Sequence, residues 1–333
     1  MTDSAVEVTV VIPTRNRARL LGRALAGVLG QQEVRLEVIV ADDCSDDETA
    51  SALGRVDDPR LRVIRLSPRQ GVARARNTAI AEAHGTWVAF LDDDDVWAPH
   101  KLRRQIESAR KNEAALVYSP AVVVDEDGRV KLVTEPAAPA ALGRAMLETN
   151  TIGTPSGVVA LTRAILDLDG FDDRLSTFAD WDLWLRLLQR GPAAMVEEPL
   201  FAYTEHGTNM HVTQIGAARA ELSYLARKHK ALCRTQGVRF GSISLSRWLL
   251  SHYRPQGRRV DAAREYAAVG IRHRSARDLG RAVGVLLGER YLRLGRALVG
   301  PDRDSDKPQG RRAAPLWLAE ALTGNAFPLP AGG

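Results

Sequence analysis

Between residues 8 and 91 the chain alternates apolar runs of strand length with stretches in which apolar residues recur at helical spacing. The apolar runs lie at 8–13, 36–41, 61–66 and 87–91, and the helical stretches lie at 18–29, 46–56 and 72–83. Strands of a parallel sheet are covered by helices on both faces, so they are apolar throughout. Repeated strand, helix and strand at this spacing predict βαβ units. We therefore expect an α/β fold with a mainly parallel sheet flanked by helices.

Polar side chains follow three of these strands, at the point where each strand ends. They are Thr14, Arg15 and Asn16 after the first strand, Asp42 and Asp43 after the second, and Asp92, Asp93, Asp94 and Asp95 after the fourth. The carboxyl ends of parallel strands meet at one edge of a sheet, where open α/β folds bind ligands. The three strand ends are therefore expected to form one site.

Four consecutive carboxylates at this edge need a cation. Like charges this close raise one another's pKa, and a hard divalent ion such as Mg²⁺ or Mn²⁺ keeps carboxylates ionised. An acidic run can also be a solvated turn. Its place directly after the buried strand at 87–91 favours a metal site.

Three common nucleotide and metal motifs are missing from the sequence. The residues after the first strand read PTRNR and not GxGxxG, which argues against a dinucleotide-binding turn. No GxxxxGK[ST] occurs, so a P-loop is excluded, and the acidic run lacks the glycine of an EF-hand loop.

The composition is typical of a globular protein, and the two cysteines indicate a reducing compartment. The chain has 333 residues, of which 45% are hydrophobic and 26% are charged, enough for one large domain or two. No apolar run reaches about 18 residues, and no basic-then-apolar leader is seen. Cys44 and Cys233 have no metal-ligand spacing. A cytoplasmic location is expected.

Charge changes sign along the chain. Residues 215–299 contain 18 Lys or Arg and 5 Asp or Glu, a net charge of +13, whereas the whole chain carries +5. This predicts a first domain over 1–214 and a basic helical region over 215–300, with helices at 217–232, 244–253, 260–271 and 276–298. The tail at 301–333 is rich in Pro, Gly and Arg and is expected to be flexible.

Two interpretations of the basic region stay open. Trp248, Leu249 and Leu250 stand beside Arg247 and Arg254, which suggests an amphipathic surface. Such a surface suits peripheral binding to the inner face of a membrane, next to a lipid-linked acceptor. It equally suits docking onto the acidic first domain or a second copy of the chain. No motif supports nucleic-acid binding.

Five segments resemble the family 2 glycosyltransferases, which have the Rossmann-like GT-A fold for nucleotide-sugars. They are TVVIPTRNR at 9–17, VIVADDCSDDET at 38–49, GVARARNTAI at 71–80, WVAFLDDDDVWAPHKL at 87–102 and FADWDLWLRL at 178–187. They occur in the order typical of the family. The resemblance implies that residues 1–214 bind a nucleotide-sugar and carry the catalytic site.

The resemblance also implies how the nucleotide is bound. Pro13, Thr14 and Arg15 match the loop around the nucleobase and ribose, with Asp42 beside it. Asp43 matches a carboxylate that accepts a hydrogen bond from the N3–H of uracil or thymine, which cytosine lacks. The expected donor is therefore a UDP- or dTDP-sugar. The alternative for both acids is that they form the turn and cap the following helix.

Arg76 matches a basic residue near the nucleotide, although it could also lie on a solvated helix face. Asp92 and Asp94 match the DxD motif, which holds the ribose and the metal on the diphosphate. Asp94 is the expected ligand, and Asp92 and Asp93 are expected to contact the nucleotide. His206 is a candidate to complete the metal site, although a lone histidine is more often structural.

Asp180 matches the catalytic base of inverting members of the family. A glutamate usually precedes it, and Ala179 stands there in this chain. Asp182 and Glu205 are the alternative bases. Residues 153–157, Gly-Thr-Pro-Ser-Gly, either line the acceptor pocket or form an ordinary loop.

The expected reaction is inverting transfer of a sugar to the hydroxyl of a saccharide, a lipid-linked saccharide or a natural product. A member of the same fold that only binds nucleotide-sugar or a protein partner is the alternative, and the presence of both Asp94 and Asp180 speaks against it. A glycosidase would need two carboxylates but no nucleotide turn. Sugar-1-phosphate nucleotidyltransfer would need a Gly-rich start with a lysine.

Overall fold

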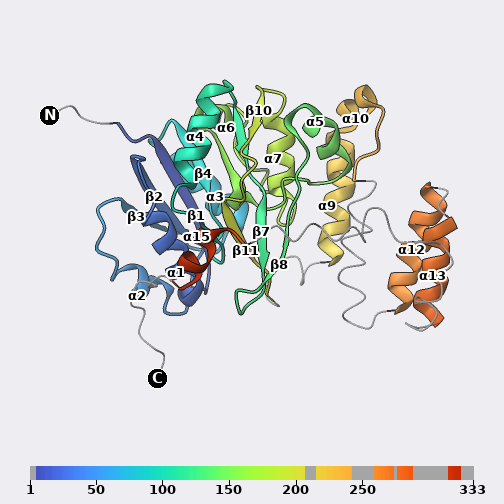
Figure 1. The fold of residues 1–333 in the computed structure, drawn as a ribbon, viewed down its shortest axis with the longest axis horizontal. Coiled ribbons are helices and arrows are strands. Elements are labelled where there is room, and N and C mark those ends of the chain that lie inside the picture. Colours follow the sequence, from blue (N-terminus) through green and yellow to red (C-terminus); the bar gives the residue numbers. More distant parts are fainter. Residues whose placement is uncertain (1–4, 207–214, 242–258, 274–275, 288–313, 324–333) are drawn as a thin grey trace. The chain divides into compact units, whose positions relative to one another are not determined.

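The computed structural model describes residues 5–206, 215–241, 259–273, 276–287 and 314–323 (Figure 1). Contacts divide the chain into two units. The first unit comprises 1–146, 151–207 and 312–333, and the second comprises 147–150 and 208–311. The boundary predicted between 214 and 215 falls in residues outside the described ranges and stays a prediction.

The first unit is built on a seven-stranded sheet (Figure 1). Its strands are β1 (Val8–Thr14), β2 (Leu36–Asp42), β3 (Leu61–Arg65), β4 (Trp87–Phe90), β6 (Leu116–Tyr118), β9 (Val158–Leu161) and β10 (Ala193–Met195). Their order is β10-β6-β9-β4-β1-β2-β3. Neighbours are parallel except at β9, which is antiparallel to both β4 and β6. This confirms the predicted α/β class.

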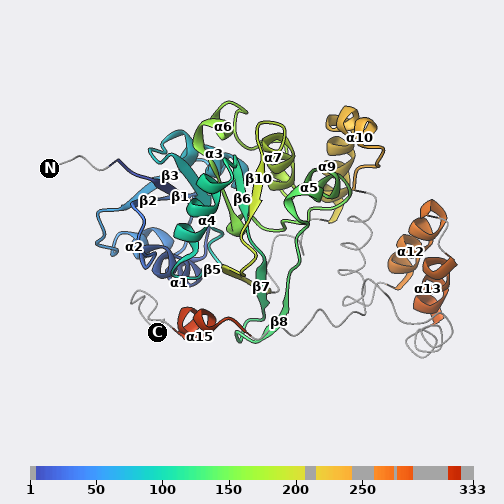
Figure 2. The same cartoon turned by 45° about the horizontal axis from the view of Figure 1, so that its top comes forward.

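Helices cover both faces of this sheet (Figure 2). The helices of this part of the chain are α1 (Ala18–Leu29), α2 (Thr49–Leu53), α3 (Val72–Ala81), α4 (Lys101–Lys111), α5 (Pro139–Glu148), α6 (Thr162–Leu166) and α7 (Ala179–Leu187), of which α1, α3, α4, α6 and α7 pack against its strands. In α1 the buried residues Leu21, Ala24, Leu25 and Val28 recur at helical spacing and join Ala89 of β4 in one core. The next residue, Phe90, points to the opposite face and packs against Trp184 of α7.

A four-stranded sheet lies beside the first, in the order β5-β11-β7-β8. Its strands are β5 (Val96–Trp97), β11 (Phe201–Thr204), β7 (Ala121–Val124) and β8 (Val130–Val133), and the 3₁₀ helix η1 (Pro155–Gly157) contacts β11. None of these short strands was predicted from the sequence. They matter because β5 and β11 flank the acidic loop.

Helix α15 (Leu316–Thr323) belongs to the first unit and lies within the tail that was predicted to be flexible. Trp317 and Leu318 are buried in the main core, and the Trp317 Nε1 donates to the carbonyl of Pro199 at 3.1 Å. The apolar side chains of this segment find a partner in the sheet unit. The residues of the tail on either side, 301–313 and 324–333, are outside the described ranges.

The second unit contains helices α9 (Ile215–Lys228), α10 (Lys230–Gln236), α12 (Arg259–His273) and α13 (Ala276–Leu287). A single helix was predicted at 217–232, whereas α9 and α10 are separate helices with His229 between them. The predicted helix at 244–253 is outside the described residues, and so is the predicted end of α13. Gly270 lets α12 and α13 approach closely, since a Cβ there would lie 2.7 Å from Leu279 Cγ.

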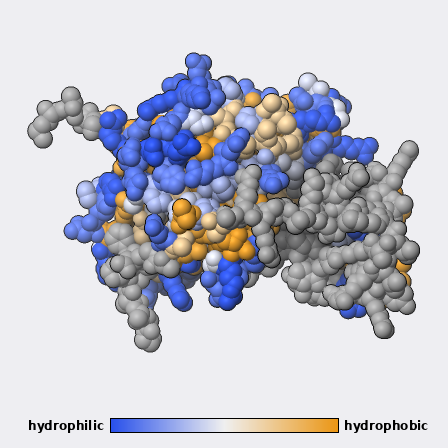
Figure 3. Space-filling model, in the orientation of Figure 1, coloured by the Kyte–Doolittle hydropathy of each residue, from blue (hydrophilic) through white to orange (hydrophobic). Residues whose placement is uncertain are grey.

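Apolar side chains are exposed on the α12 and α13 pair. Ile271 is 72% exposed, and Val283, Leu286 and Leu287 of α13 are more than half exposed. Elsewhere, Figure 3 shows hydrophobic residues around α15 of the first unit, where Leu316 is 96% exposed. Among the described helices, none combines the length and hydropathy needed to cross a bilayer.

Candidate active site

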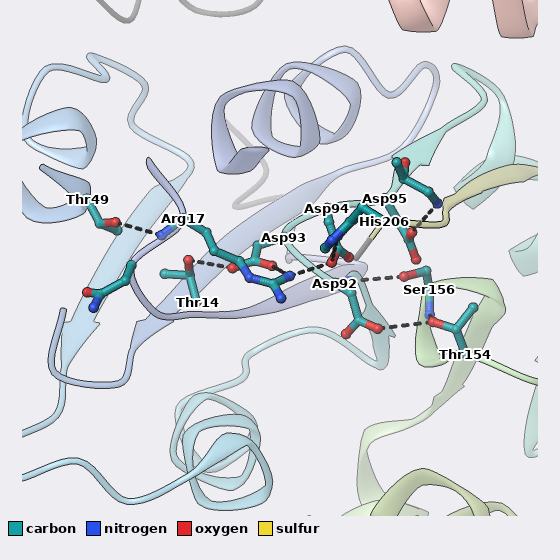
Figure 4. A network of polar contacts seen from close by, with 12 residues as sticks. Thr14, Arg17, Thr49, Asp92, Asp93, Asp94, Asp95, Thr154, Ser156 and His206 are labelled. Atoms are coloured by element: carbon teal, nitrogen blue, oxygen red, sulfur yellow. Dashed lines mark hydrogen bonds and ion pairs between the residues drawn. The ribbon is translucent and has the colours of Figure 1, made fainter. Parts of the chain in front are cut away.

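The ends of β1, β2 and β4 meet at one edge of the large sheet, as predicted. Thr14 pairs with Asp42 across β1 and β2, and Asp43 N donates to the carbonyl of Thr14 at 2.9 Å. Val11 pairs with Phe90, so the acidic loop at 92–95 leaves β4 beside the end of β1. Figure 4 shows the polar network that results.

Asp92 is held by two segments that are far apart in the sequence. Its carboxylate accepts from Arg76 Nη2 at 2.5 Å and from Thr154 Oγ1 at 3.0 Å, and its N–H donates to Ser156 Oγ at 3.0 Å. Arg76 is buried and its guanidinium lies 5.3 Å from the ring centre of Phe171. Arg76 is therefore part of the site and not a solvated residue on a helix face.

Asp93 faces the loop that follows β1. Its carboxylate accepts from Thr14 Oγ1 at 2.7 Å and from Arg17 Nη1 at 3.1 Å. Burial and the neighbouring charge of Asp94 raise the pKa of Asp93, although Arg17 opposes this. Thr14 and Asp93, both predicted to contact nucleotide, thus touch each other.

Asp94 is brought together with His206, the other predicted metal ligand. His206 Nε2 lies 2.9 Å from Asp94 Oδ2, and Arg17 Nη1 contacts the same oxygen (Figure 4). Burial alone would raise the pKa of Asp94, but the hydrogen bond with His206 and the charge of Arg17 outweigh it and lower that pKa. Asp94 is therefore an ionised carboxylate.

Asp95 connects the acidic loop to β11. It is fully buried, and its Oδ1 accepts from the N–H of Thr204 at 3.1 Å. Burial, with the charges of Asp94 and Asp92, raises the pKa of Asp95 well above its ordinary range. Because Glu205 and His206 follow Thr204, this bond sets the position of His206 beside Asp94.

The two acids after β2 have different environments. Asp42 Oδ1 accepts from the N–H of Ser45 at 2.9 Å, which is a turn-forming bond. Asp43 accepts from the N–H of Gln70 at 2.6 Å and of Gly71 at 2.8 Å, one on each oxygen. A carboxylate has about four lone-pair sites, so Asp43 keeps capacity for a ligand.

The loop after β1 is fixed against the loop after β2. Asn16 takes a left-handed conformation with φ of 54°, and its N–H donates to Ser45 Oγ at 2.9 Å. Arg17 N donates to Thr49 Oγ1 at 3.2 Å. Pro13 is buried and Arg15 is partly buried here. Sequence reasoning assigned no role to Arg17, although a basic residue beside an acidic strand end is a signal for it.

Asp180 lies in the first turn of α7 and is 9% exposed. It shares a helix face with Trp184, whose ring centre is 5.4 Å from that of Phe90, two residues before the acidic loop. The alternative base Asp182 is fully buried and accepts from Arg186 Nε at 2.7 Å. Arg186 also donates to the carbonyls of Leu168 and Gly170, so Asp182 belongs to a structural cluster.

A buried lysine supports the segment at 153–157. Lys101 Nζ donates to Gln105 Oε1 at 2.6 Å and lies 3.9 Å from the ring centre of Trp97. Burial lowers the pKa of Lys101 well below the usual 10.5. Gln105 Nε2 and Trp97 Nε1 donate to the carbonyls of Gly157 and Ser156, at 2.8 and 2.9 Å. This frame holds Thr154 and Ser156 against Asp92.

The donor set suits Mg²⁺ or Mn²⁺ only in part. Within the described residues, no three His, Cys, Asp or Glu side chains are arranged to hold an ion. Asp94 supplies a carboxylate, the ligand type that both ions prefer, whereas the imidazole of His206 is a ligand type preferred by softer transition metals. Because Mg²⁺ typically uses one or two carboxylates together with substrate phosphates, the residues fit an ion that arrives with a diphosphate.

Comparison with known proteins identifies the family. The model for "Glycosyl transferase family 2" matches residues 9–168. The succinoglycan biosynthesis protein ExoO of Rhizobium meliloti is 41% identical over 127 residues, which are 38% of this chain and 36% of ExoO. The glucosyltransferase WfgD of Escherichia coli is 30% identical over 185 residues, covering 55% of this chain and 70% of WfgD. The chain belongs to glycosyl transferase family 2.

Two solved structures share the fold of this chain. Staphylococcus aureus TarS 1-349 in complex with UDP-GlcNAc superimposes with a TM-score of 0.55, 17% identity and 88% coverage of each chain. The mannosyltransferase PcManGT of Pyrobaculum calidifontis, in complex with GDP-Man and Mn²⁺, gives 0.58 at 19% identity, covering 96% of this chain and 87% of its own. The GT-A fold expected from the sequence is thereby confirmed.

This family 2 member is a glycosyltransferase that transfers a sugar from a nucleotide-sugar. The structure joins Thr14, Asp93, Asp94 and His206 through Arg17, and it joins Arg76 to Asp92 in the same acidic loop. Asp43 lies next to these residues, because its backbone N–H donates to the carbonyl of Thr14. The particular roles of these side chains and of Asp180 remain predictions.

Proposed function

We propose that this glycosyltransferase moves a sugar from a UDP- or dTDP-sugar to an acceptor hydroxyl, with inversion of the anomeric centre and with Mg²⁺ or Mn²⁺. The observation that carries the proposal is the junction of three strand ends, where Thr14, Asp43 and the acidic loop lie at one sheet edge. Different residues are responsible for base recognition, metal binding and proton transfer, and a separate experiment tests each of these roles.

Asp43 recognises the base. It is 5% exposed and held by two backbone N–H groups, so its carboxylate is fixed before a nucleotide arrives. Uracil and thymine offer an imino N–H to its remaining lone pairs, whereas cytosine would leave a buried acceptor unpaired. Pro13, Thr14 and Arg15 surround base and ribose, and Asp42 holds the turn that carries Asp43. WfgD is named for UDP-Glc and TarS was solved with UDP-GlcNAc, which supports a uridine donor.

Calorimetry with UDP, dTDP, CDP and GDP in the presence of Mn²⁺ tests the base. UDP or dTDP should bind at least about tenfold more tightly than CDP, the cost of one unpaired buried acceptor. GDP is included because PcManGT holds GDP-Man. Equal affinity for CDP in the wild type, or an unchanged preference in Asp43→Ala, would remove the role of Asp43.

Asp92, Asp93 and Arg76 bind the ribose and diphosphate side of the donor, and Asp94 and His206 would hold the ion. When bound, the ion would neutralise the charge that develops on the leaving nucleoside diphosphate. Affinity for UDP should therefore drop in EDTA, and Asp94→Ala should abolish the difference between Mn²⁺ and EDTA. Undiminished binding in EDTA would contradict the metal assignment.

Asp180 is the base that takes the proton from the acceptor hydroxyl. The hydroxyl oxygen then attacks the anomeric carbon from the face opposite the diphosphate, so the configuration inverts. A member that only binds nucleotide-sugar would retain UDP affinity and show no turnover with any acceptor. Product NMR decides the stereochemistry, and a retained anomeric configuration would overturn the assignment.

The acceptor side is formed by residues 153–157. Thr154 and Ser156 touch Asp92, so this segment lies next to the donor-binding residues. The acceptor class is a saccharide, a lipid-linked saccharide or a natural product. WfgD is named for a diphosphoundecaprenol-linked acceptor, which supports a lipid-linked saccharide, and ExoO is named for succinoglycan biosynthesis, which supports a saccharide. Membrane contact and contact with a second copy stay open for the basic helices.

A further inference from the structure

Arg17 is the counter-ion of the two central acids, Asp93 and Asp94. Its Nη1 lies 3.1 Å from Asp93 Oδ1 and contacts Asp94 Oδ2, while Asp92 is paired with a different cation, Arg76. The Arg17 side chain is 22% exposed, against 8% for Asp93 and 10% for Asp94. The guanidinium thus covers the acids from the solvent side.

The contacts of Asp94 exclude simultaneous binding of a metal at the same oxygen. Asp94 Oδ2 already accepts from Arg17 and lies 2.9 Å from His206 Nε2. A divalent ion on this oxygen would sit next to the guanidinium, and two cations on one carboxylate oxygen repel each other. A metal can therefore bind this oxygen of Asp94 only when Arg17 leaves it.

A diphosphate that binds together with the metal offers Arg17 a new partner. The planar fork of a guanidinium matches phosphate oxygens and stays charged at any relevant pH. Arg17 stands in the loop after β1, three residues beyond Thr14, and its N–H is fixed by Thr49. Its side chain can therefore turn from the acids to an anion without moving the loop.

We propose that Arg17 competes with the metal for Asp94 and, when the metal and a nucleoside diphosphate bind, exchanges Asp94 for the diphosphate. This inference rests on the proposed function of the site. Arg17 then disfavours binding of the metal alone and favours binding of metal and nucleotide together. It couples the two ligands, so each binds more tightly when the other is present.

The test measures Mn²⁺ affinity by electron paramagnetic resonance of free Mn²⁺, with and without UDP, in the full chain. In Arg17→Met, Mn²⁺ alone should bind about tenfold more tightly than in the wild type, and UDP in saturating Mn²⁺ about tenfold more weakly, the loss of one charge-assisted hydrogen bond in each case. Arg17→Lys, which keeps the charge, should leave the affinity for Mn²⁺ alone within about threefold of the wild type. Arg19→Met, an exposed change in the same segment, is the matched control and should alter neither affinity.

The outcomes separate this inference from the proposed function. If the wild type binds Mn²⁺ and UDP but Arg17→Met binds Mn²⁺ alone no more tightly, the role of Arg17 is wrong and the function stands. If the wild type binds none of UDP, dTDP or GDP, the proposed function fails. Circular dichroism checks folding, and Arg17→Gln repeats the measurement if the methionine variant is unfolded; an unchanged Mn²⁺ affinity in that variant also overturns the inference.

Discussion

The acidic loop of the first unit buries its charged side chains, whereas helices α12 and α13 of the second unit expose apolar side chains. In the loop, Asp93, Asp94 and Asp95 are buried, and each is tied to a strand end or a cation. On α12 and α13 the apolar side chains of Ile271 and Leu287 are exposed. Buried charge is costly unless it is used or paired, so the loop is where chemistry is expected. The exposed apolar groups are tested instead for binding to vesicles and for self-association.

The largest effect is expected from Asp180→Asn in the first unit. Asparagine keeps the shape of the side chain but cannot take a proton, so turnover should fall by about 10² to 10⁴ with donor affinity preserved. Steady-state kinetics and UDP calorimetry on one preparation separate the two. Near-normal turnover would redirect the search for the base to Glu205 or Asp182.

Asp182→Asn, two residues further along, is expected to change stability instead. It removes the charge opposite Arg186 at a site with no exposed surface, which should lower the free energy of unfolding by about 3 kcal/mol. Urea unfolding measures this, with Asp180→Asn as the comparison. A variant as stable as the wild type but inactive would exchange the roles assigned to the two acids.

Lys101 gives a smaller effect that depends on pH. Its pKa is lowered in the folded protein, so between that pKa and 10.5 the unfolded chain binds a proton that the folded chain does not. The stability of the wild type should therefore rise with pH relative to Lys101→Met, by up to about 1.4 kcal/mol per pH unit inside this window. Urea unfolding at several pH values gives the difference, and the exposed Lys111→Met on the same helix should show no such rise. A difference that does not vary with pH would mean that Lys101 is charged in its buried place.

The smallest effect on stability is expected in the second unit. Leu286 and Leu287 are 52% and 58% exposed, so changing both to serine should shift the free energy of unfolding by less than about 1 kcal/mol. The buried Val285→Ser should cost more. Co-sedimentation with anionic vesicles and sedimentation velocity complete the test. Loss of vesicle binding in the double variant would support the membrane interpretation, and loss of self-association would support a second copy.

The fold of the first ninety or so residues follows from the apolar pattern because each element there is local. Helix α1 has the predicted bounds, and β2 extends the prediction by one residue. The short strands β5, β7 and β11 escaped prediction because two to four residues carry too little periodicity. Their pairing is decided by contacts with Thr204 and Phe201, far along the chain.

The sequence predicted which strand ends form the site, but it did not predict all of the contacts between their side chains. The meeting of Thr14 with Asp93 follows from parallel pairing of neighbouring strands. The approach of His206 to Asp94 depends on β11, which the sequence pattern did not reveal. Arg17 was overlooked because side chains at a loop choose their partners only after the strands are placed.

The antiparallel strand β9 has a consequence for how this enzyme can diversify. The chain leaves the sheet at the end of β6, at Tyr118, and returns to the same edge at Val158, which pairs with it. Everything in between, including β7, β8 and α5, forms an excursion that starts and finishes beside the acidic loop. This segment also contains Thr154 and Ser156, which bond Asp92, and β7, which pairs with β11. Its replacement would therefore alter the proposed acceptor side and the support of Asp92 together, so the two sides of the site are expected to diversify as one.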